Sequence, residues 1–369
     1  MIPPSPQIFH GREQELAELL LILNQETPRV AILGPGGIGK TSLARAALHH
    51  SKVNTKYSQR HFIFCQSTNT CTSLVASIAT HLGLPQSKDP TRKIVHHFRS
   101  SDPCLLVLDN FETPWEFIAF RAEVEEFLSL LDDIPHLAIL VTMRGTERPK
   151  KVKWSRPFLP PLKPLASLAA LKMFTDIAED QHDKEKVMEL LNLTGYLPLA
   201  VSLIANIVSY EGCDYALAHW RTEKTHILSD GYDKSSNLNA SIEISLASSR
   251  MTADAQQLLI VLSILPDGLS DTDLSQSGLQ IPNILKCKAT LIQTSLAYSE
   301  NQHLKCLVPI QEYIRDKHSA SPSLKFSIRQ HFHKMLKLWD TFRILPSQEI
   351  VDHISRNLGN ISSILKDAL

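Results

Sequence analysis

The stretch GPGGIGKT at residues 34–41 matches the phosphate-binding loop pattern G-x-x-x-x-G-K-[ST] at every fixed position. Glycines let the backbone turn with its N–H groups toward phosphate oxygens, Lys40 supplies a positive charge, and the Thr41 hydroxyl can ligate Mg²⁺. The β-rich run 29–33 before the loop and the helix-forming run 41–48 after it supply the strand and helix that this motif requires. The sequence therefore predicts a phosphate site at a helix N-terminus.

Composition narrows the class of protein. The chain has 369 residues, 43% of them apolar and 21% charged, as expected for two or three soluble globular domains. Lys plus Arg and Asp plus Glu both number 38, a balance that argues against nucleic acid and membrane surfaces as partners. The six cysteines form no C-x-x-C pair, which argues against zinc and against a disulfide framework. Without a membrane-length apolar run or a signal peptide, a cytoplasmic location is expected.

Short apolar runs alternate with helical stretches in the first part of the chain. Strands are expected at residues 30–33, 62–65, 104–108 and 137–141. Helices are expected at residues 11–24, 41–48, 74–82 and 115–131. This alternation predicts an α/β fold, with a parallel sheet covered by helices on both faces. The basic, proline-rich segment 148–164 reads as a last short strand followed by a domain boundary.

The rest of the chain has mainly helical periodicity. Helices are expected at residues 165–180, 185–193, 199–210 and 215–223, and the polar stretch 229–237 indicates a second boundary. Beyond it, helices at 253–265, 282–294 and 310–317 with a hairpin at 295–308 suggest a winged-helix module. The predicted domains are therefore an α/β nucleotide domain (1–160), a helical domain (161–235), a winged-helix domain (236–322) and a helical tail (323–369).

Carboxylates and an arginine follow two of the expected strands. Asp109 ends an apolar strand and is the expected Walker B aspartate, which holds Mg²⁺ with Thr41. The next residue is Asn110, whose neutral amide cannot accept a proton from water, so fast hydrolysis is not expected. Glu112 is a candidate catalytic base, and the alternative is a solvated surface glutamate. Arg144, after the strand that contains Thr142, can fork onto the γ-phosphate, and the alternative is a solvated surface arginine.

Five segments fall in the order and approximate spacing of NB-ARC domains, namely residues 9–13, 34–41, 105–110, 141–144 and 195–200. Over roughly residues 7–320 the chain thus resembles the STAND class of P-loop signalling NTPases, which includes plant resistance proteins, apoptosome scaffolds and fungal NOD-like receptors. The amino-acid sequences of several of these segments are similar to those of fungal members. The resemblance implies a bound adenine nucleotide, ATP with Mg²⁺ or ADP.

The resemblance also implies roles for individual residues. It places the adenine against Phe9, His10, Gly11 and Arg12. The phosphates would lie in a loop made of Gly34, Pro35, Gly36, Gly37, Ile38, Gly39, Lys40, Thr41 and Ser42. Pro198 and Leu199, in the segment GYLPL, would pack on the nucleotide, although a proline is also common at the start of a helix.

The expected function is a nucleotide-dependent signalling switch with slow, regulatory ATP hydrolysis. Relatives often carry a Met-His-Asp motif that locks the ADP state, but residues 303–313 contain no His-Asp pair, so that lock is not carried over. Asn110 motivates a second hypothesis, a non-hydrolysing ADP-bound scaffold. A weaker third hypothesis is a transcription regulator that binds DNA through its winged helix, which the charge balance does not favour. Protein partners and nucleotide-dependent self-association are expected in either of the first two cases.

Overall fold

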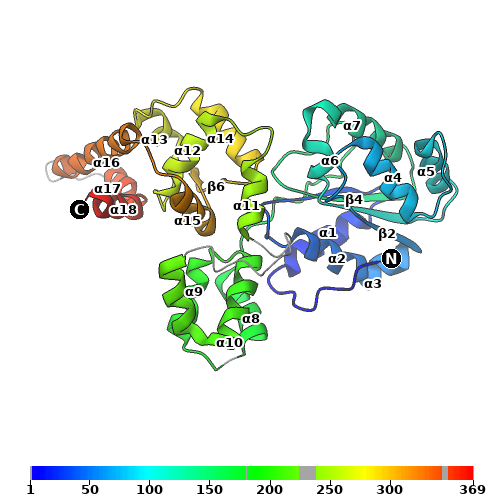
Figure 1. Ribbon diagram of the computed structural model, residues 1–369, viewed down its shortest axis with the longest axis horizontal. Coiled ribbons are helices and arrows are strands. Elements are labelled where there is room, and N and C mark those ends of the chain that lie inside the picture. Colours follow the sequence, from blue (N-terminus) through cyan, green and yellow to red (C-terminus); the bar gives the residue numbers. More distant parts are fainter. Residues whose placement is uncertain (1, 180, 224–237, 343–347, 369) are drawn as a thin grey trace. The chain divides into compact units, whose positions relative to one another are not determined.

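The computed structural model describes residues 2–179, 181–223, 238–342 and 348–368 (Figure 1). The chain divides into two compact units. The first comprises Met1–Leu191 with Tyr196–Tyr210, and the second comprises Asn192–Gly195 with Glu211–Leu369. The predicted boundary stretch 229–237, and the domain limit at 235, lie outside the described residues.

A parallel four-stranded sheet forms the centre of the first unit. Its strands lie in the order β1 (Arg29–Leu33), β4 (Leu137–Met143), β3 (Cys104–Asp109) and β2 (Gln59–Phe64). Every residue of β1, β3 and β4 is buried, because helices cover both faces of a parallel sheet. The α/β fold predicted from alternating apolar runs is therefore confirmed, with all four strands at the expected places.

Helices of the first unit lie on both sides of this sheet. They are α1 (Glu13–Leu23), α2 (Lys40–His49), α3 (Ser51–Lys56), α4 (Cys71–His81), α5 (Pro90–Arg99), α6 (Glu112–Glu116), α7 (Ile118–Asp132), α8 (Ser167–Ala178), α9 (Lys184–Leu193) and the first part of α10 (Pro198–Glu223). Figure 1 shows α4 and α7 on one side of the sheet and α1 and α2 on the other. The predicted helix 115–131 is instead two helices, because Phe117 between them has extended geometry. The two helices predicted at 199–210 and 215–223 lie within α10 on either side of a kink at Gly212, whose backbone is not helical.

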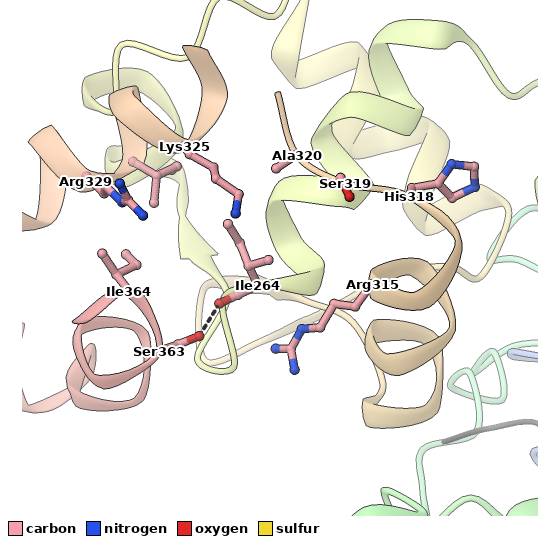
Figure 2. A pocket seen from close by; sticks show the side chains of 10 residues that line it. Ile264, Arg315, His318, Ser319, Ala320, Lys325, Arg329, Ser363 and Ile364 are labelled. Carbon is pink, nitrogen blue, oxygen red and sulfur yellow. Dashed lines mark hydrogen bonds between the residues drawn. The ribbon is translucent and has the colours of Figure 1, made fainter. Parts of the chain in front are cut away.

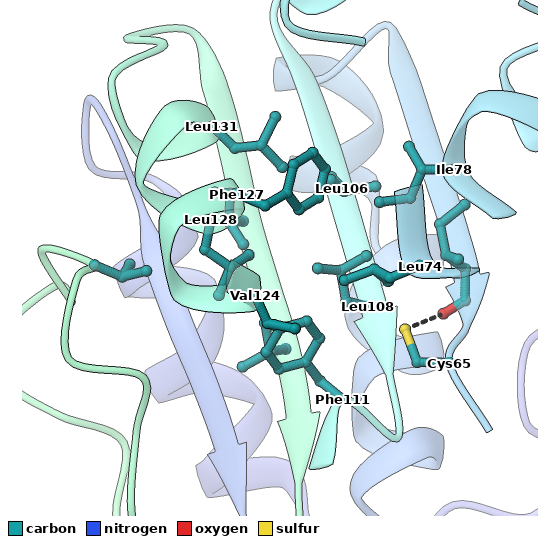
Figure 3. Close-up of a cluster of buried hydrophobic side chains, with 14 of the residues drawn as sticks. Cys65, Leu74, Ile78, Leu106, Leu108, Phe111, Val124, Phe127, Leu128 and Leu131 are labelled. Carbon is teal, nitrogen blue, oxygen red and sulfur yellow. Dashed lines mark hydrogen bonds between the residues drawn. The ribbon is translucent and has the colours of Figure 1, made fainter. Parts of the chain in front are cut away.

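The core on the α7 side follows from the spacing of apolar residues. Val124, Phe127, Leu128 and Leu131 recur at intervals of three and four residues, so they form one stripe of α7. Figure 3 shows this stripe facing side chains of β3 and α4, including Leu106, Leu108, Leu74 and Ile78. All of these side chains are buried. This packing fixes the end of β3, where the predicted functional residues begin.

The strand predicted within 148–164 does not form. Two backbone N–H groups of this segment bond to the edge strand β1: Ser155 donates to the Arg29 carbonyl (2.9 Å) and Leu162 to the Leu33 carbonyl (2.8 Å). The prolines at 157, 160 and 161 have no N–H to donate, so a continuous ladder cannot form between those two bonds. The segment instead runs along the edge of the sheet as irregular backbone.

The second unit is largely helical. Its elements after α10 are α11 (Leu238–Leu246), α12 (Ala253–Ser263), β5 (Leu269–Ser270), α13 (Asp271–Gln276), α14 (Ile284–Gln293), β6 (Tyr298–Glu300), β7 (His303–Lys305), α15 (Val308–Lys317), α16 (Pro322–Phe342), α17 (Gln348–Ser355) and α18 (Leu358–Ala368). The three short strands form an antiparallel sheet in the order β5-β7-β6. The predicted hairpin is present, and the helical nature of the tail is confirmed over its described residues. None of the helices that the structure describes is long and apolar enough to span a membrane.

The tail helix α18 is hydrogen-bonded to the turn between α12 and β5. The Asp267 N–H donates to Asn360 Oδ1 (2.9 Å), and the Asn360 N–H donates back to Asp267 Oδ2 (2.9 Å). Asn360 Nδ2 also donates to the Gly268 carbonyl (2.8 Å), and the side chain of Asn360 is fully buried. This reciprocal set satisfies polar groups that would otherwise be buried without partners.

Candidate functional site

The phosphate-loop motif forms the connection between β1 and α2. Gly37 and Gly39 have positive φ (73° and 96°), a region that glycine enters without steric penalty. Lys40 is buried, and its ammonium donates to the carbonyls of Gly34 (2.9 Å) and Pro35 (2.8 Å). Burial disfavours the charged amine and lowers the pKa of Lys40 to about 8, although the nearby Glu112 carboxylate opposes this shift.

Asp109 ends β3 and lies at the centre of a buried group of hydroxyls. Its Oδ1 accepts hydrogen bonds from Thr41 Oγ1 (2.8 Å) and from Thr142 Oγ1 (2.6 Å). Burial raises the pKa of Asp109, and the hydrogen bonds from Thr142 and Thr41 oppose that rise by stabilising the carboxylate. The predicted neighbours Thr41 and Asp109 are therefore brought together. The role of Thr142 in holding this carboxylate was not predicted, because a threonine in a buried strand carries no distinct sequence signal.

The residues after β3 and β4 also meet. Glu112, in the first turn of α6, places Oε1 3.2 Å from Arg144 Nε, and the two side chains are only 10% and 17% exposed. The alternatives considered for these two residues, a solvated surface glutamate and a solvated surface arginine, are therefore wrong for the described structure. Glu112 Oε2 is buried without a hydrogen-bond partner among the described residues. Asn110 has positive φ (57°) and donates its N–H to Thr142 Oγ1 (3.0 Å), so its turn is held by the same threonine that binds Asp109.

The N-terminal segment lies along the back of the phosphate loop. The buried Arg12 guanidinium donates to the carbonyls of Ile38 (3.1 Å) and Lys163 (2.6 Å). Gly11 has φ 68°, and a Cβ there would come 2.4 Å from the Ala169 Cβ, so no side chain fits. His10 Nε2 lies 2.6 Å from Asp176 Oδ2 on α8. These contacts fix the path of residues 10–12. The Arg12 guanidinium contacts the phosphate loop at a backbone carbonyl, that of Ile38.

The start of α10 packs directly on the phosphate loop. The Leu199 N–H donates to the Gly37 carbonyl (3.1 Å). A Cβ added to Gly37 would lie 2.9 Å from the Leu199 Cβ, and one added to Gly39 would lie 3.9 Å from the Pro198 ring. Pro198 and Leu199, predicted from the sequence to pack on the nucleotide, thus lie against the phosphate loop. The structure also starts α10 at Pro198, as the simpler interpretation of that proline required.

Comparison with known proteins finds a family model and a relative that are similar to this chain. Residues 4–186 match the family model described as novel STAND NTPase 1. The probable disease resistance RPP8-like protein 2 of Arabidopsis thaliana is 23% identical over 254 residues, which are 61% of this chain and 25% of that protein. The chain therefore spans about a quarter of the length of this relative.

Two solved structures match most of the chain at low sequence identity. A Walker-type ATPase of Pyrococcus abyssi matches with a TM-score of 0.58 and 14% identity, covering 85% of this chain and 98% of that chain. The Aeropyrum pernix Orc1 protein, solved in a complex with DNA, has a TM-score of 0.46 and 14% identity, with 85% and 94% of the two chains covered. The first likeness supports the P-loop ATPase fold.

Proposed function

We propose that this chain, a P-loop NTPase of the STAND class, is a signalling switch set by adenine nucleotide, either ATP with Mg²⁺ or ADP. The observation that carries the proposal is the contact between Gly37 of the phosphate loop and Leu199 at the start of α10. Because Leu199 donates a backbone hydrogen bond to Gly37 and leaves no room for a Cβ there, a change in the shape of the loop would move the start of α10. Binding or loss of phosphate in the loop would therefore change the position of α10.

The buried polar atoms of the loop fit a nucleotide with a divalent cation. Thr41 and Asp109 offer a hydroxyl and a carboxylate oxygen side by side, which is the ligand chemistry of Mg²⁺. Bound there, the metal would neutralise phosphate charge. Lys40, whose ammonium has only two carbonyls as described hydrogen-bond partners, would turn to the β and γ phosphates. Phe9, His10, Gly11 and Arg12 would lie at the adenine, and the Arg12 guanidinium would also hold the loop through the Ile38 carbonyl.

Slow hydrolysis would depend on Glu112 and Arg144. Arg144 would turn to the γ-phosphate, and Glu112 would then orient and deprotonate the attacking water with a carboxylate freed from its ion pair. Asn110 cannot take that role, because its amide is not a base. An ion pair that must open before each turnover favours a slow, regulatory rate.

Nucleotide binding to the purified chain, with and without Lys40→Ala, tests the site. We expect the variant to bind ATP at least about tenfold more weakly, since a charge-assisted contact is worth about 1.5–3 kcal/mol. Lys52→Ala, on the exposed surface of α3, is the control and should bind as the wild type does. Equally tight binding in Lys40→Ala would remove the basis of the proposal.

A non-hydrolysing ADP-bound scaffold is the second candidate, and Asn110 favours it. Single-turnover hydrolysis of ATP by the wild type and by Glu112→Gln separates the two functions. The switch predicts measurable turnover that the substitution reduces by about 10²-fold or more, as for loss of a general base. The scaffold predicts no turnover in either protein.

We also propose that the second unit carries a winged-helix module used for packing within the protein. The order of α12, β5, α13, α14, β6 and β7 supports this assignment. Protein partners and nucleotide-dependent self-association remain part of the proposal. Native mass measured in ADP and in ATP tests self-association, which predicts a larger assembly in only one of the two nucleotides.

A further inference from the structure

The basic segment 148–158 of the first unit has no part in the nucleotide site proposed above. It contains five Lys or Arg and no Asp or Glu, whereas the whole chain has 38 of each kind in 369 residues. The five are Arg148, Lys150, Lys151, Lys153 and Arg156. The neutrality of the chain therefore hides a local excess of positive charge. We propose that this segment binds single-stranded nucleic acid, a function additional to the nucleotide switch and independent of it.

Most of these cations have no carboxylate partner. In the part of the chain that the structure describes, only Lys151 of the five forms an ion pair, and its partner is Glu126 on α7. Both side chains are exposed, so water screens this pair and a ligand can displace Glu126 at small cost. Figure 2 shows a contrasting pocket in the second unit, where Arg315, Lys325 and Arg329 all interact with other residues. The charge of the segment is thus available to an anion.

The backbone of the segment is held in place by the body of the first unit. The Lys150 N–H donates to Glu125 Oε1 (3.2 Å), and the Lys153 N–H donates to Asp132 Oδ2 (3.3 Å). Glu125 is buried and Asp132 pairs with Arg29, and neither carboxylate forms an ion pair with a lysine of the segment in the described structure. The lysine side chains are exposed. A backbone that is fixed before binding loses little entropy when a ligand binds.

Planar side chains belong to the same segment. The Phe158 ring is 40% exposed, and the guanidiniums of Arg148 and Arg156 lie over it, each with Cζ 4.4 Å from the ring centroid. Arg148 Nη2 also donates to the Leu159 carbonyl (3.0 Å), which orients this guanidinium. Unstacked bases stack on aromatic rings and on guanidinium planes, and lysines neutralise the phosphates between the bases. Both the base and the phosphate of a nucleotide thus find partners within one segment.

The same features disfavour duplex DNA and a membrane surface as partners. Residues 148–158 are irregular backbone, whereas an α-helix or a two-stranded ribbon is what enters the major groove. Among the larger apolar side chains of the segment, Val152 is buried, Trp154 is half-buried and only Phe158 is exposed. Binding to lipid uses a row of exposed apolar side chains. A single strand is the anionic partner that uses the planar groups as well as the lysines.

Binding of a fluorescein-labelled oligo(dT) of about 20 nucleotides to the full chain tests the proposal. The segment variant is Lys150→Ala with Lys153→Ala, which keeps both backbone N–H groups and removes two exposed charges. Its control, Lys52→Ala with Lys88→Ala, removes the same charge from exposed positions elsewhere in the first unit. At about 50 mM salt we expect binding at least about tenfold weaker in the segment variant and less than about twofold weaker in the control. The slope of log affinity against log salt should fall by about 1.4 in the segment variant alone.

Two further variants test stacking and independence from the nucleotide site. Arg156→Lys keeps the charge but removes the guanidinium plane, so we expect binding about threefold weaker or more with an unchanged salt slope. Lys40→Ala should bind oligo(dT) as the wild type does, because the phosphate loop takes no part. The same measurements with oligo(U) show which strand, DNA or RNA, binds more tightly, and tight binding of either supports the proposal.

Equal affinity in the segment variant and its control would overturn the proposal, as would an absence of binding of both strands at about 100 µM protein and about 50 mM salt. A duplex of the same length that binds as tightly as oligo(dT) would overturn the single-strand assignment. Unchanged affinity in Arg156→Lys would overturn the role of stacking. Vesicles of phosphatidylcholine with phosphatidylserine are added as a competitor. Vesicle binding that depends on Lys150 and Lys153, and that oligo(dT) does not displace, would overturn the assignment in favour of a membrane surface.

Discussion

The carbonyl oxygen of Gly37, in the phosphate loop, accepts a hydrogen bond of 3.1 Å from the N–H of Leu199, the second residue of helix α10. Gly37 has φ 73°, and a Cβ there would lie 2.9 Å from the Leu199 Cβ. Gly37→Ala should therefore combine backbone strain with a steric clash. Urea unfolding and ATP affinity of the variant measure both effects.

Gly83→Ala separates the two effects of that substitution. Gly83 also has positive φ (66°), but no heavy atom lies within 4 Å of a Cβ added there. We expect Gly83→Ala to lower the free energy of unfolding by about 1 kcal/mol, and Gly37→Ala by about 1–3 kcal/mol more because of overpacking. Equal losses in the two variants would contradict the close contact with Leu199.

Thr142→Val should weaken both stability and Mg²⁺-dependent binding. The substitution removes the 2.6 Å hydrogen bond to Asp109, which keeps the bond from Thr41, and it removes the acceptor of the partly buried Asn110 N–H. We expect the free energy of unfolding to fall by about 1–3 kcal/mol and more Mg²⁺ to be needed for half-maximal ATP binding. Thr68→Val is the control, since its buried hydroxyl donates to the nearby Cys65 carbonyl (2.8 Å) and its loss should leave the Mg²⁺ dependence unchanged.

The pH dependence of nucleotide binding should report on Lys40. Its pKa is lowered to about 8 by burial, so above about pH 8 the amine of the free protein is mostly neutral. Bound phosphate favours the ammonium and raises that pKa again, so binding at about pH 9 should take up close to one proton. Calorimetry in two buffers of different ionisation enthalpy measures this number. Lys40→Arg keeps its charge at this pH, and its residual binding should occur without proton uptake.

The buried arginine at the start of β1 should be among the most important residues for stability. Arg29 is 2% exposed and pairs with Asp132, 5% exposed, at 2.8 Å. It also donates to the backbone carbonyls of Asp132 and Ile134. Arg29→Met leaves the Asp132 carboxylate buried without its partner, and we expect a loss of about 3–5 kcal/mol in urea unfolding.

An exposed ion pair provides the contrast. Lys151 and Glu126 form a contact in which the side chains are 48% and 62% exposed. Lys151→Met should change the free energy of unfolding by less than about 1 kcal/mol, because water screens such pairs. Similar losses in Arg29→Met and Lys151→Met would show that burial does not determine the strength of these pairs here.

The sheet and the phosphate loop could be predicted from sequence because each has a local signature. Continuous apolar runs identify strands buried on both faces, and the spacing of glycines with Lys40 identifies the loop. The break at Phe117 was not predictable, because residues 115–131 contain no Gly or Pro that would mark the end of a helix. The short elements β5 and α13 have too few residues to show a period.

Site residues that act through tertiary contacts were harder to predict. Thr142 and Asp109 are 33 residues apart, and only the pairing of β3 beside β4 brings them together. Arg12 was expected at the adenine, and nothing local to it shows that its guanidinium reaches the carbonyls of Ile38 and Lys163. The strand expected within 148–164 does not form for a local reason, because its prolines lack the N–H donors that strand pairing needs.

The bonds between Asp267 and Asn360 join positions that are 93 residues apart, which sets an order for folding during synthesis. The polypeptide leaves the ribosome from its N-terminus at about 5–20 residues per second, so the turn at Asp267 waits about 5–20 s for its partner. During that interval water takes the place of Asn360 as the hydrogen-bond partner of the Asp267 N–H and the Gly268 carbonyl. The second unit thus closes late on the nascent chain, after the β1 to β4 sheet of the first unit has all of its strands available.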